Sequence, residues 1–192
     1  MACANKEIRL HTAAGEIVIS LRSDVAPTAV QYVVSLIDEG VYDGSTLYRS
    51  TTLGHPGGPR LVQGGPFDQI LTNNTRHEPP RDLRTISEFE TTVESGLRHC
   101  RGAVSLGRDL PASGEVIADM FFCLGEFPEL DYGGRSEPDE RGFPVFGEVK
   151  SGLAILDELA SGETAGSAKV ALLEGQILSK PLVIESASSK LW

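Results

Sequence analysis

Two polar side chains, Arg49 and Gln63, have types and a spacing suited to a shared site. Residues 46–50 alternate as a β-strand does, and a Gly/Pro-rich loop over 54–59 separates them from the short apolar run before Gln63. We therefore expect two neighbouring strands to carry a guanidinium and a carboxamide. The two glycines after Gln63 allow another backbone or a ligand to come close.

Each member of this pair also has an ordinary structural interpretation. An arginine on a strand is most often a surface residue. A glutamine before two glycines can simply satisfy the backbone at a bend. The rest of the chain has to decide between these interpretations and a functional one.

The length and composition favour one turn-rich domain. A chain of 192 residues with 40% hydrophobic and 23% charged residues is ordinary for a globular protein. Its 21 glycines and 11 prolines suit a mainly β fold better than a helical bundle. We expect a single domain over residues 1–192, with no internal repeat.

Charge and cysteine usage narrow the partners and the compartment. A formal net charge of −10 argues against nucleic-acid binding, because phosphate contacts need a cationic surface. Three cysteines without a CxxC spacing predict no disulfide framework. No apolar run reaches membrane-spanning length and the first residues lack a signal sequence. We expect a cytoplasmic monomer that binds no membrane.

Periodicity predicts the main elements. Residues 7–12 and 16–21 alternate around a glycine-containing turn and predict a β-hairpin. Pro27 begins a helix whose apolar residues recur every three or four positions until Gly40. A second helix covers Leu153 to Leu159 and is closed by Gly162.

The remaining strands are shorter and are separated by polar segments. Apolar runs predict strands at 102–106, 120–124 and 145–149, and a last pair of strands within 172–186, split near 179–181. Residues 67–97 and 132–142 are polar and aperiodic. We expect both to be loops on the surface, and a loop as long as the first is often functional.

Several motifs, in this order, make the chain resemble the cyclophilin-type peptidyl-prolyl cis–trans isomerases. They are the hairpin from Ile8 to Leu21, Ala26-Pro27-Thr28, the run from Gly40 to Arg49, Val62-Gln63-Gly64-Gly65, Gly102 to Leu106, Phe121-Phe122-Cys123, Leu130-Asp131 and Val145 to Val149. No single motif is specific, but the ordered series is, and it covers nearly the whole chain.

The resemblance implies a closed eight-stranded antiparallel β-barrel with an α-helix capping each end and a site in an outer groove. It also implies an isomerase that acts on proline-containing peptides and proteins without a metal or other cofactor. Arg49 takes the place of the catalytic arginine, Gln63 that of the second polar residue, and Phe122 that of the floor of the proline pocket. The substrate-binding residues would be Leu61, Met120, Leu106, Gly107, Leu130 and Phe143.

The chemistry of that family suits an arginine. Rotation about an X–Pro bond is slow because amide resonance opposes it. A rigid, permanently charged guanidinium can donate a hydrogen bond to the proline nitrogen once the amide is twisted.

The chain also departs from the family pattern. Arg60 and Leu61 replace a Phe-Met pair, Met120 replaces a glutamine, Phe143 replaces a histidine, and no tryptophan precedes Leu130. Charges at the groove rim, at Arg60 and Glu129, predict altered specificity. A non-catalytic module that binds proline-bearing segments in the same groove is the alternative function.

Other chemistries find little support in the sequence. His77, His99 and Cys100 match no metal-ligand spacing. Nothing in the pattern places two carboxylates face to face for hydrolysis.

Overall fold

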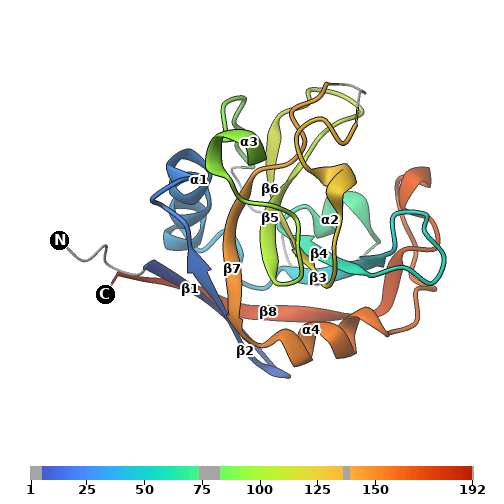
Figure 1. Cartoon of the computed structure of the whole chain (residues 1–192). Helices are drawn as coiled ribbons and strands as arrows, with labels where there is room; N and C mark the ends of the chain where they lie inside the picture. Colours follow the sequence, from blue (N-terminus) through green and yellow to red (C-terminus); the bar gives the residue numbers. More distant parts are fainter. Residues whose placement is uncertain (1–5, 74–82, 136–138, 192) are drawn as a thin grey trace.

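The structure is a computed structural model that describes residues 6–73, 83–135 and 139–191. Its strands are β1 (Lys6–Thr12), β2 (Gly15–Leu21), β3 (Thr46–Thr51), β4 (Leu61–Gly65), β5 (Ala103–Arg108), β6 (Val116–Cys123), β7 (Val145–Ser151) and β8 (Ile177–Leu191). They form a closed barrel in the order β1-β2-β7-β5-β6-β4-β3-β8, with every pairing antiparallel (Figure 1). The predicted eight-stranded barrel is confirmed.

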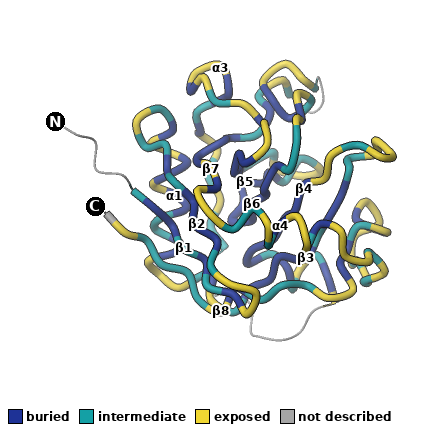
Figure 2. The backbone as a smooth tube through the Cα atoms, turned by 60° about the horizontal axis from the view of Figure 1, so that its bottom comes forward, coloured by how far each residue is buried: buried dark blue, intermediate teal, exposed yellow. Residues whose placement is uncertain are grey.

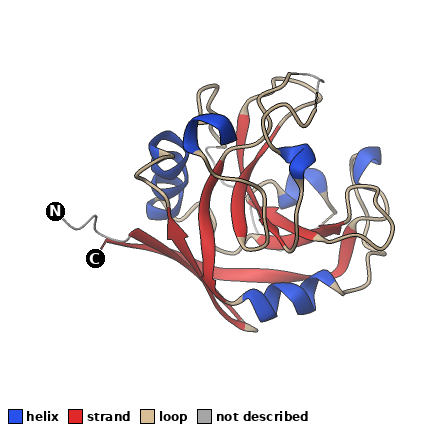
Figure 3. Cartoon of the chain, in the orientation of Figure 1, coloured by secondary structure: helices blue, strands red, loops and turns tan. Residues whose placement is uncertain are grey.

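Two helices pack on this barrel, as predicted. They are α1 (Pro27–Asp38) and α4 (Leu153–Ala160), and Figure 3 shows them on different sides of the strands. Pro27 occupies the first turn of α1, where its missing N–H is not needed, and Gly40 beyond the helix end has φ +71°. The buried residues of both helices join the core of the barrel. Of the helices in the described ranges, none is long and apolar enough to cross a membrane.

The long segment 67–97 contains more regular structure than the sequence indicates. It includes two four-residue helices, α2 (Asp68–Leu71) and α3 (Thr92–Ser95), while residues 74–82 lie outside the described part. One helical turn is too short to produce a periodic apolar pattern, so no such pattern could predict them. Two 3₁₀ turns, Pro128–Leu130 and Ala171–Leu173, complete the regular elements within the described residues.

The C-terminal segment is one strand rather than the two that were predicted. β8 runs without a break and pairs with both β1 and β3. Its register against β3 shifts, because Leu47 lies opposite Leu182 whereas Arg49 lies opposite Ile177. Pro181 falls within this irregular stretch, where a proline removes no ladder hydrogen bond.

The barrel interior is filled by alternate residues of the strands. Figure 2 shows the strands as mostly buried and the connecting loops as mostly exposed. Because strand side chains alternate between faces, every second residue is available to the outer surface. This alternation decides which residues form the site.

Candidate active site

A pocket of about 160 Å³ lies on the outer side of the barrel, where β3, β4, β5 and β6 meet the loops that follow them. It is lined by Arg49, Leu53, Leu61, Gln63, Gly107, Arg108, Leu110, Pro111, Ile117, Phe121, Leu130, Arg135, Phe143 and Leu172. The lining divides into a polar half around Arg49 and an apolar half around Phe121.

The polar half consists of one guanidinium held by two carboxamides. Arg49 and Gln63 lie opposite each other on β3 and β4. Arg49 donates from Nη1 to Gln63 Oε1 at 2.6 Å, and from Nε and Nη2 to Gln176 Oε1 at 2.9 and 2.6 Å. In the described part of the chain these bonds go to carboxamides and none goes to a carboxylate. Among the described residues, no carboxylate therefore pairs directly with the guanidinium beside the pocket.

Burial lowers the pKa of Arg49 from its usual value, and the nearby Arg135 adds to this effect. A guanidinium stays charged at neutral pH despite such a shift. Gln176 was not predicted from the sequence. It lies 127 positions from Arg49, and no local pattern links the two residues.

The apolar half is a cluster around Phe121. This residue packs with Leu61, Leu130 and Phe143, and its ring meets that of Phe143 edge to face at a centroid distance of 5.6 Å. Leu61, Gly107, Leu130 and Phe143, which the resemblance implies as substrate-binding residues, all line this pocket. A Cβ at Gly107 would lie 3.3 Å from Ile117 Cγ1, so a side chain at this position would crowd Ile117, which also lines the pocket.

Three predicted site residues lie elsewhere. Phe122, Met120 and Leu106 are fully buried in the barrel core and do not line the pocket. The pairing register gives the reason: Gln63 lies opposite Phe121, so the first phenylalanine of the pair shares its face.

The sequence did contain a signal for the phenylalanine that lines this pocket. Asp119 stands two positions before Phe121, on the same face of β6, whereas Met120 and Phe122 share the other face. An aspartate indicates which of the two faces is not the apolar core. Reading β6 by alternation selects Phe121.

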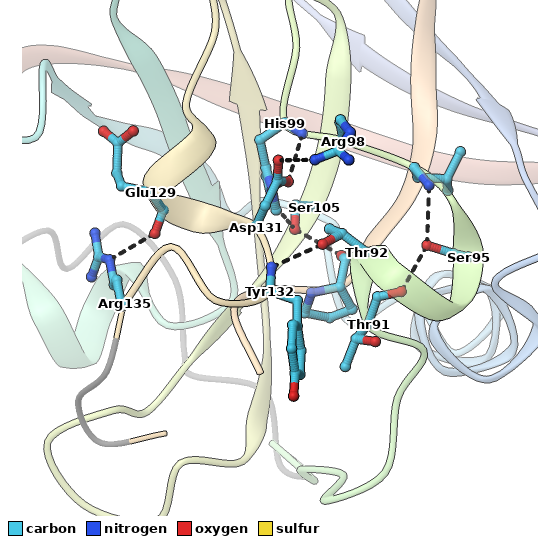
Figure 4. Close-up of polar contacts among 12 residues, drawn as sticks. Thr91, Thr92, Ser95, Arg98, His99, Ser105, Glu129, Asp131, Tyr132 and Arg135 are labelled. Carbon is cyan, nitrogen blue, oxygen red and sulfur yellow. Dashed lines mark hydrogen bonds and ion pairs between the residues drawn. The ribbon is translucent and has the colours of Figure 1, made fainter. Parts of the chain in front are cut away.

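A buried polar cluster supports the Phe121 ring from behind. His99 stacks on Phe121 at 5.6 Å, and Figure 4 shows His99 between Asp131 and Ser105. His99 Nδ1 lies 2.7 Å from Asp131 Oδ1, and Nε2 lies 3.1 Å from Ser105 Oγ. Burial lowers the pKa of His99. The hydrogen bonds from His99 hold the pKa of Asp131 below its usual value, although burial acts in the opposite direction.

This cluster has the residue types of a hydrolytic triad but not its accessibility. Ser105 and His99 are 0% and 1% exposed, and the Ser105 hydroxyl donates to the Pro144 carbonyl at 2.7 Å. A nucleophile must reach its substrate. The cluster therefore supports the pocket floor and does no hydrolysis.

Two further arginines line the pocket, with different surroundings. Arg108 is buried, forms a two-point ion pair with Asp139, and lowers the pKa of that carboxyl to about 2. Arg135, in the predicted loop 132–142, lies over the Phe143 ring at 5.7 Å and donates to the Glu129 carbonyl (Figure 4). Residues 136–138 of that loop lie outside the described part.

The described residues include no group of three His, Cys, Asp or Glu side chains placed to hold a metal ion. His77, considered as a ligand above, lies outside the described residues. Cys100 and Cys123 are free thiols.

Comparisons with known proteins agree on one family. The family model described as cyclophilin type peptidyl-prolyl cis-trans isomerase/CLD matches residues 7–186. Peptidyl-prolyl cis-trans isomerase A of Dickeya dadantii is 27% identical over 186 residues, covering 97% of this chain and 85% of that protein. Peptidyl-prolyl cis-trans isomerase B of Escherichia coli is 24% identical over 181 residues, covering 94% and 98%.

A solved structure shares the fold. The crystal structure of a cyclophilin type peptidyl-prolyl cis-trans isomerase of Cryptosporidium parvum, in the presence of the dipeptide Ala-Pro, matches with a TM-score of 0.64 at 17% identity. The match covers 95% of this chain and 97% of that one.

Proposed function

The chain belongs to the family of cyclophilin-type peptidyl-prolyl cis–trans isomerases, and on that premise we propose that its reaction takes place in the pocket between Arg49 and Phe121. The protein is a peptidyl-prolyl isomerase, which accelerates rotation about X–Pro bonds. One observation carries the choice of site: a guanidinium whose side-chain partners among the described residues are carboxamides borders an apolar pocket.

The substrate is a proline-containing segment of a peptide or protein. The proline ring enters the apolar half and contacts Phe121, Leu61 and Phe143, which offer it apolar surface. The dipeptide present with the Cryptosporidium parvum protein supports a ligand of this kind.

Arg49 then acts on the twisted amide. Resonance sets a barrier of roughly 18–20 kcal/mol to rotation about the C–N bond. As the bond twists, the proline nitrogen loses resonance and becomes a hydrogen-bond acceptor, so a donor aimed at it stabilises the transition state more than the ground state. The reaction breaks no covalent bond and needs no nucleophile.

The size of this contribution can be bounded. A hydrogen bond from a charged donor contributes about 1.5–3 kcal/mol. Because each 1.4 kcal/mol corresponds to a tenfold change in rate, Arg49 supplies roughly a tenfold to hundredfold acceleration. Exclusion of water and anchoring of the ring in the apolar half supply the rest.

Gln63 and Gln176 position the guanidinium. Each presents a carboxamide oxygen to Arg49, so together they restrict its direction without neutralising its charge. A carboxylate in either place would accept the same bonds but would compete with the substrate for the cation.

The test is an isomerase assay on X–Pro peptides by NMR exchange, with Arg49→Ala and the control Arg101→Ala. Arg101 is exposed and pairs with Asp157, away from the pocket lining. We expect kcat/KM to fall ten- to hundredfold in Arg49→Ala and to stay unchanged in the control. Wild-type activity in Arg49→Ala would place the reaction elsewhere.

We further propose a cytoplasmic monomer. The free thiols of Cys100 and Cys123 are consistent with a reducing compartment. Size-exclusion chromatography with light scattering would test the oligomeric state, and a mass near twice 20.5 kDa would contradict it.

A further inference from the structure

One buried carboxylate beneath the site has no role in the reaction described so far. Asp119, on β6, is 0% exposed and receives three hydrogen bonds. Tyr48 Oη and Gln63 Nε2 donate to its Oδ2 at 2.5 and 3.3 Å, and the Phe67 backbone N–H donates to its Oδ1 at 3.0 Å. No cation is among these partners.

Asp119 and Arg49 meet opposite ends of one carboxamide. Gln63 presents Oε1 to the guanidinium and its Nε2 to the carboxylate. Arg49 has only donors on its side chain, and an ionised aspartate has only acceptors. A reversed amide would place N–H groups against the guanidinium and an oxygen against the carboxylate. The two charged groups therefore allow one orientation of Gln63.

We propose that Asp119 is a positioning residue of the isomerase: as a carboxylate it keeps Gln63 Oε1 facing Arg49, and thereby directs the guanidinium at the substrate. This inference rests on the proposed function, because it assigns a cause to the orientation of the proposed catalytic arginine. Asp119 does not line the pocket, so in this proposal it acts through Gln63 and not on the substrate itself.

The backbone around Asp119 leaves room for a carboxylate and for little else. Gly65, at the end of β4, has φ +143°, and a Cβ there would lie 2.8 Å from Asp119 Oδ1. Three donors converge on the two oxygens from β3, β4 and the segment after β4. An asparagine, which has one acceptor oxygen and two donor hydrogens, would leave at least one of those donors facing an N–H group.

The surroundings also make this carboxylate sensitive to pH. Burial raises the pKa of Asp119 to about 6, and the hydrogen bonds from Tyr48, Phe67 and Gln63 only partly oppose that rise. Asp68 raises the pKa further. Arg49 is a cation that faces the Asp119 carboxylate from the other side of the Gln63 carboxamide.

The direction of the activity change follows from the charge state. Above about pH 6 the carboxylate accepts from Gln63 and the arginine is aligned. As the pH falls through this value, the protonated carboxyl gains a donor and no longer enforces the amide orientation. Turnover should therefore fall on the acid side.

The test compares wild type, Asp119→Asn, Gln63→Ala and the double variant in the X–Pro assay from pH 5 to 8. We expect Asp119→Asn to lower kcat about tenfold at pH 7.5 with KM unchanged, because the proline pocket is intact. The fall in kcat on the acid side of the pH profile, near pH 6 (the acid limb), should be present in wild type and absent in Asp119→Asn. Asp43→Asn, at an exposed position, should keep both wild-type turnover and its pH profile.

The double variant separates positioning from a structural role. If Asp119 acts through Gln63, Asp119→Asn should add no loss of kcat in the Gln63→Ala background. If Asp119→Asn lowered kcat as much in the Gln63→Ala background as in wild type, the inference would be overturned. An acid limb that persisted in Asp119→Asn would also overturn it. If Asp119→Asn does not fold, an unchanged acid limb in Gln63→Ala would overturn it as well.

Failure of this inference is distinguishable from failure of the proposed site. A large loss in Arg49→Ala with wild-type behaviour in Asp119→Asn would reject the positioning role alone. No loss in Arg49→Ala would reject the site itself.

Discussion

The polar and apolar halves of the pocket are supported by two buried carboxylates in opposite electrostatic situations. Asp119 lies behind Gln63 and has no cation among its direct partners in the described part of the chain, and burial raises its pKa. Asp131 lies behind His99 and receives bonds from the ring, from the His99 backbone and from Arg98, so its pKa is lowered. Asp119 is the more deeply buried of the two, so the depth of burial and the partners together account for the opposite pKa shifts.

The difference indicates that the two halves respond to different conditions. The polar half is held by hydrogen bonds whose strength depends on a proton near pH 6. The apolar half is held by ring stacking and by an aspartate that stays ionised to lower pH. Mild acid should therefore affect turnover before it affects the proline pocket.

The largest expected effect separates the two phenylalanines of β6. Phe122→Ala removes a fully buried core side chain and should lower the free energy of unfolding by about 3–5 kcal/mol, as urea unfolding would measure. Phe121→Ala should raise KM at least about tenfold in protein that remains folded, because it removes the pocket floor. If Phe122→Ala raised KM and Phe121→Ala did not, Phe122 would be the floor of the pocket.

A smaller effect is expected behind the apolar half. Asp131→Asn breaks the bonds to His99 and should lower the free energy of unfolding at pH 7 by about 1–3 kcal/mol. Because the pKa of Asp131 is lower in the folded state, its stabilisation is complete above the unfolded value and is lost as the pH falls through the folded one. Urea unfolding at pH 7 and pH 3 should show a difference between variant and wild type that shrinks in acid. A constant difference would contradict this.

A smaller effect again is expected at the second carboxamide of the polar half. Gln176→Ala should lower kcat about two- to tenfold and leave KM unchanged, because one neutral partner of the guanidinium is lost. Gln31→Ala, at an exposed position of α1, is the matched control and should have wild-type kcat. Equal turnover in the two variants would mean that Gln63 alone aligns Arg49.

The smallest expected effect concerns the substrate preference that Arg135 confers at the rim of the pocket. Within the described residues the Arg135 side chain has no carboxylate partner, and Figure 4 shows the Glu129 carboxylate turned away from it. Peptides with an acidic residue beside the proline should be preferred over neutral ones, and Arg135→Ala should reduce that preference about two- to fivefold at low salt. Arg22, which pairs with Asp24 and does not line the pocket, gives the control variant Arg22→Ala. Equal preference ratios in the two variants would mean that Arg135 does not contribute to specificity.

The sequence predicted the parts of the site that depend on local order. The strand pair carrying Arg49 and Gln63, the hairpin and α1 all follow from alternation, turn residues and helix periodicity. The family resemblance added the barrel, which no local pattern specifies.

The sequence failed where the answer depends on register or on distant pairing. The Phe-Phe motif suggested Phe122, but the pairing of β4 with β6 brings Phe121 beside Gln63. Gln176 and Asp119 reach the site only through closure of the barrel and burial, which a local pattern does not contain.

Because β8 closes the barrel, the time at which β8 is synthesised determines when a new chain can become active. β8 is the last strand of the described residues and pairs with β1, and Figure 1 shows the start of β1 beside the end of β8. Gln176 immediately precedes β8 and lies 127 positions after Arg49, so a ribosome adding about 5–20 residues per second makes it roughly 6–25 s later. A nascent chain therefore holds its arginine without the second carboxamide and without a closed barrel. An emerging chain should therefore acquire isomerase activity of its own only after translation has passed β8.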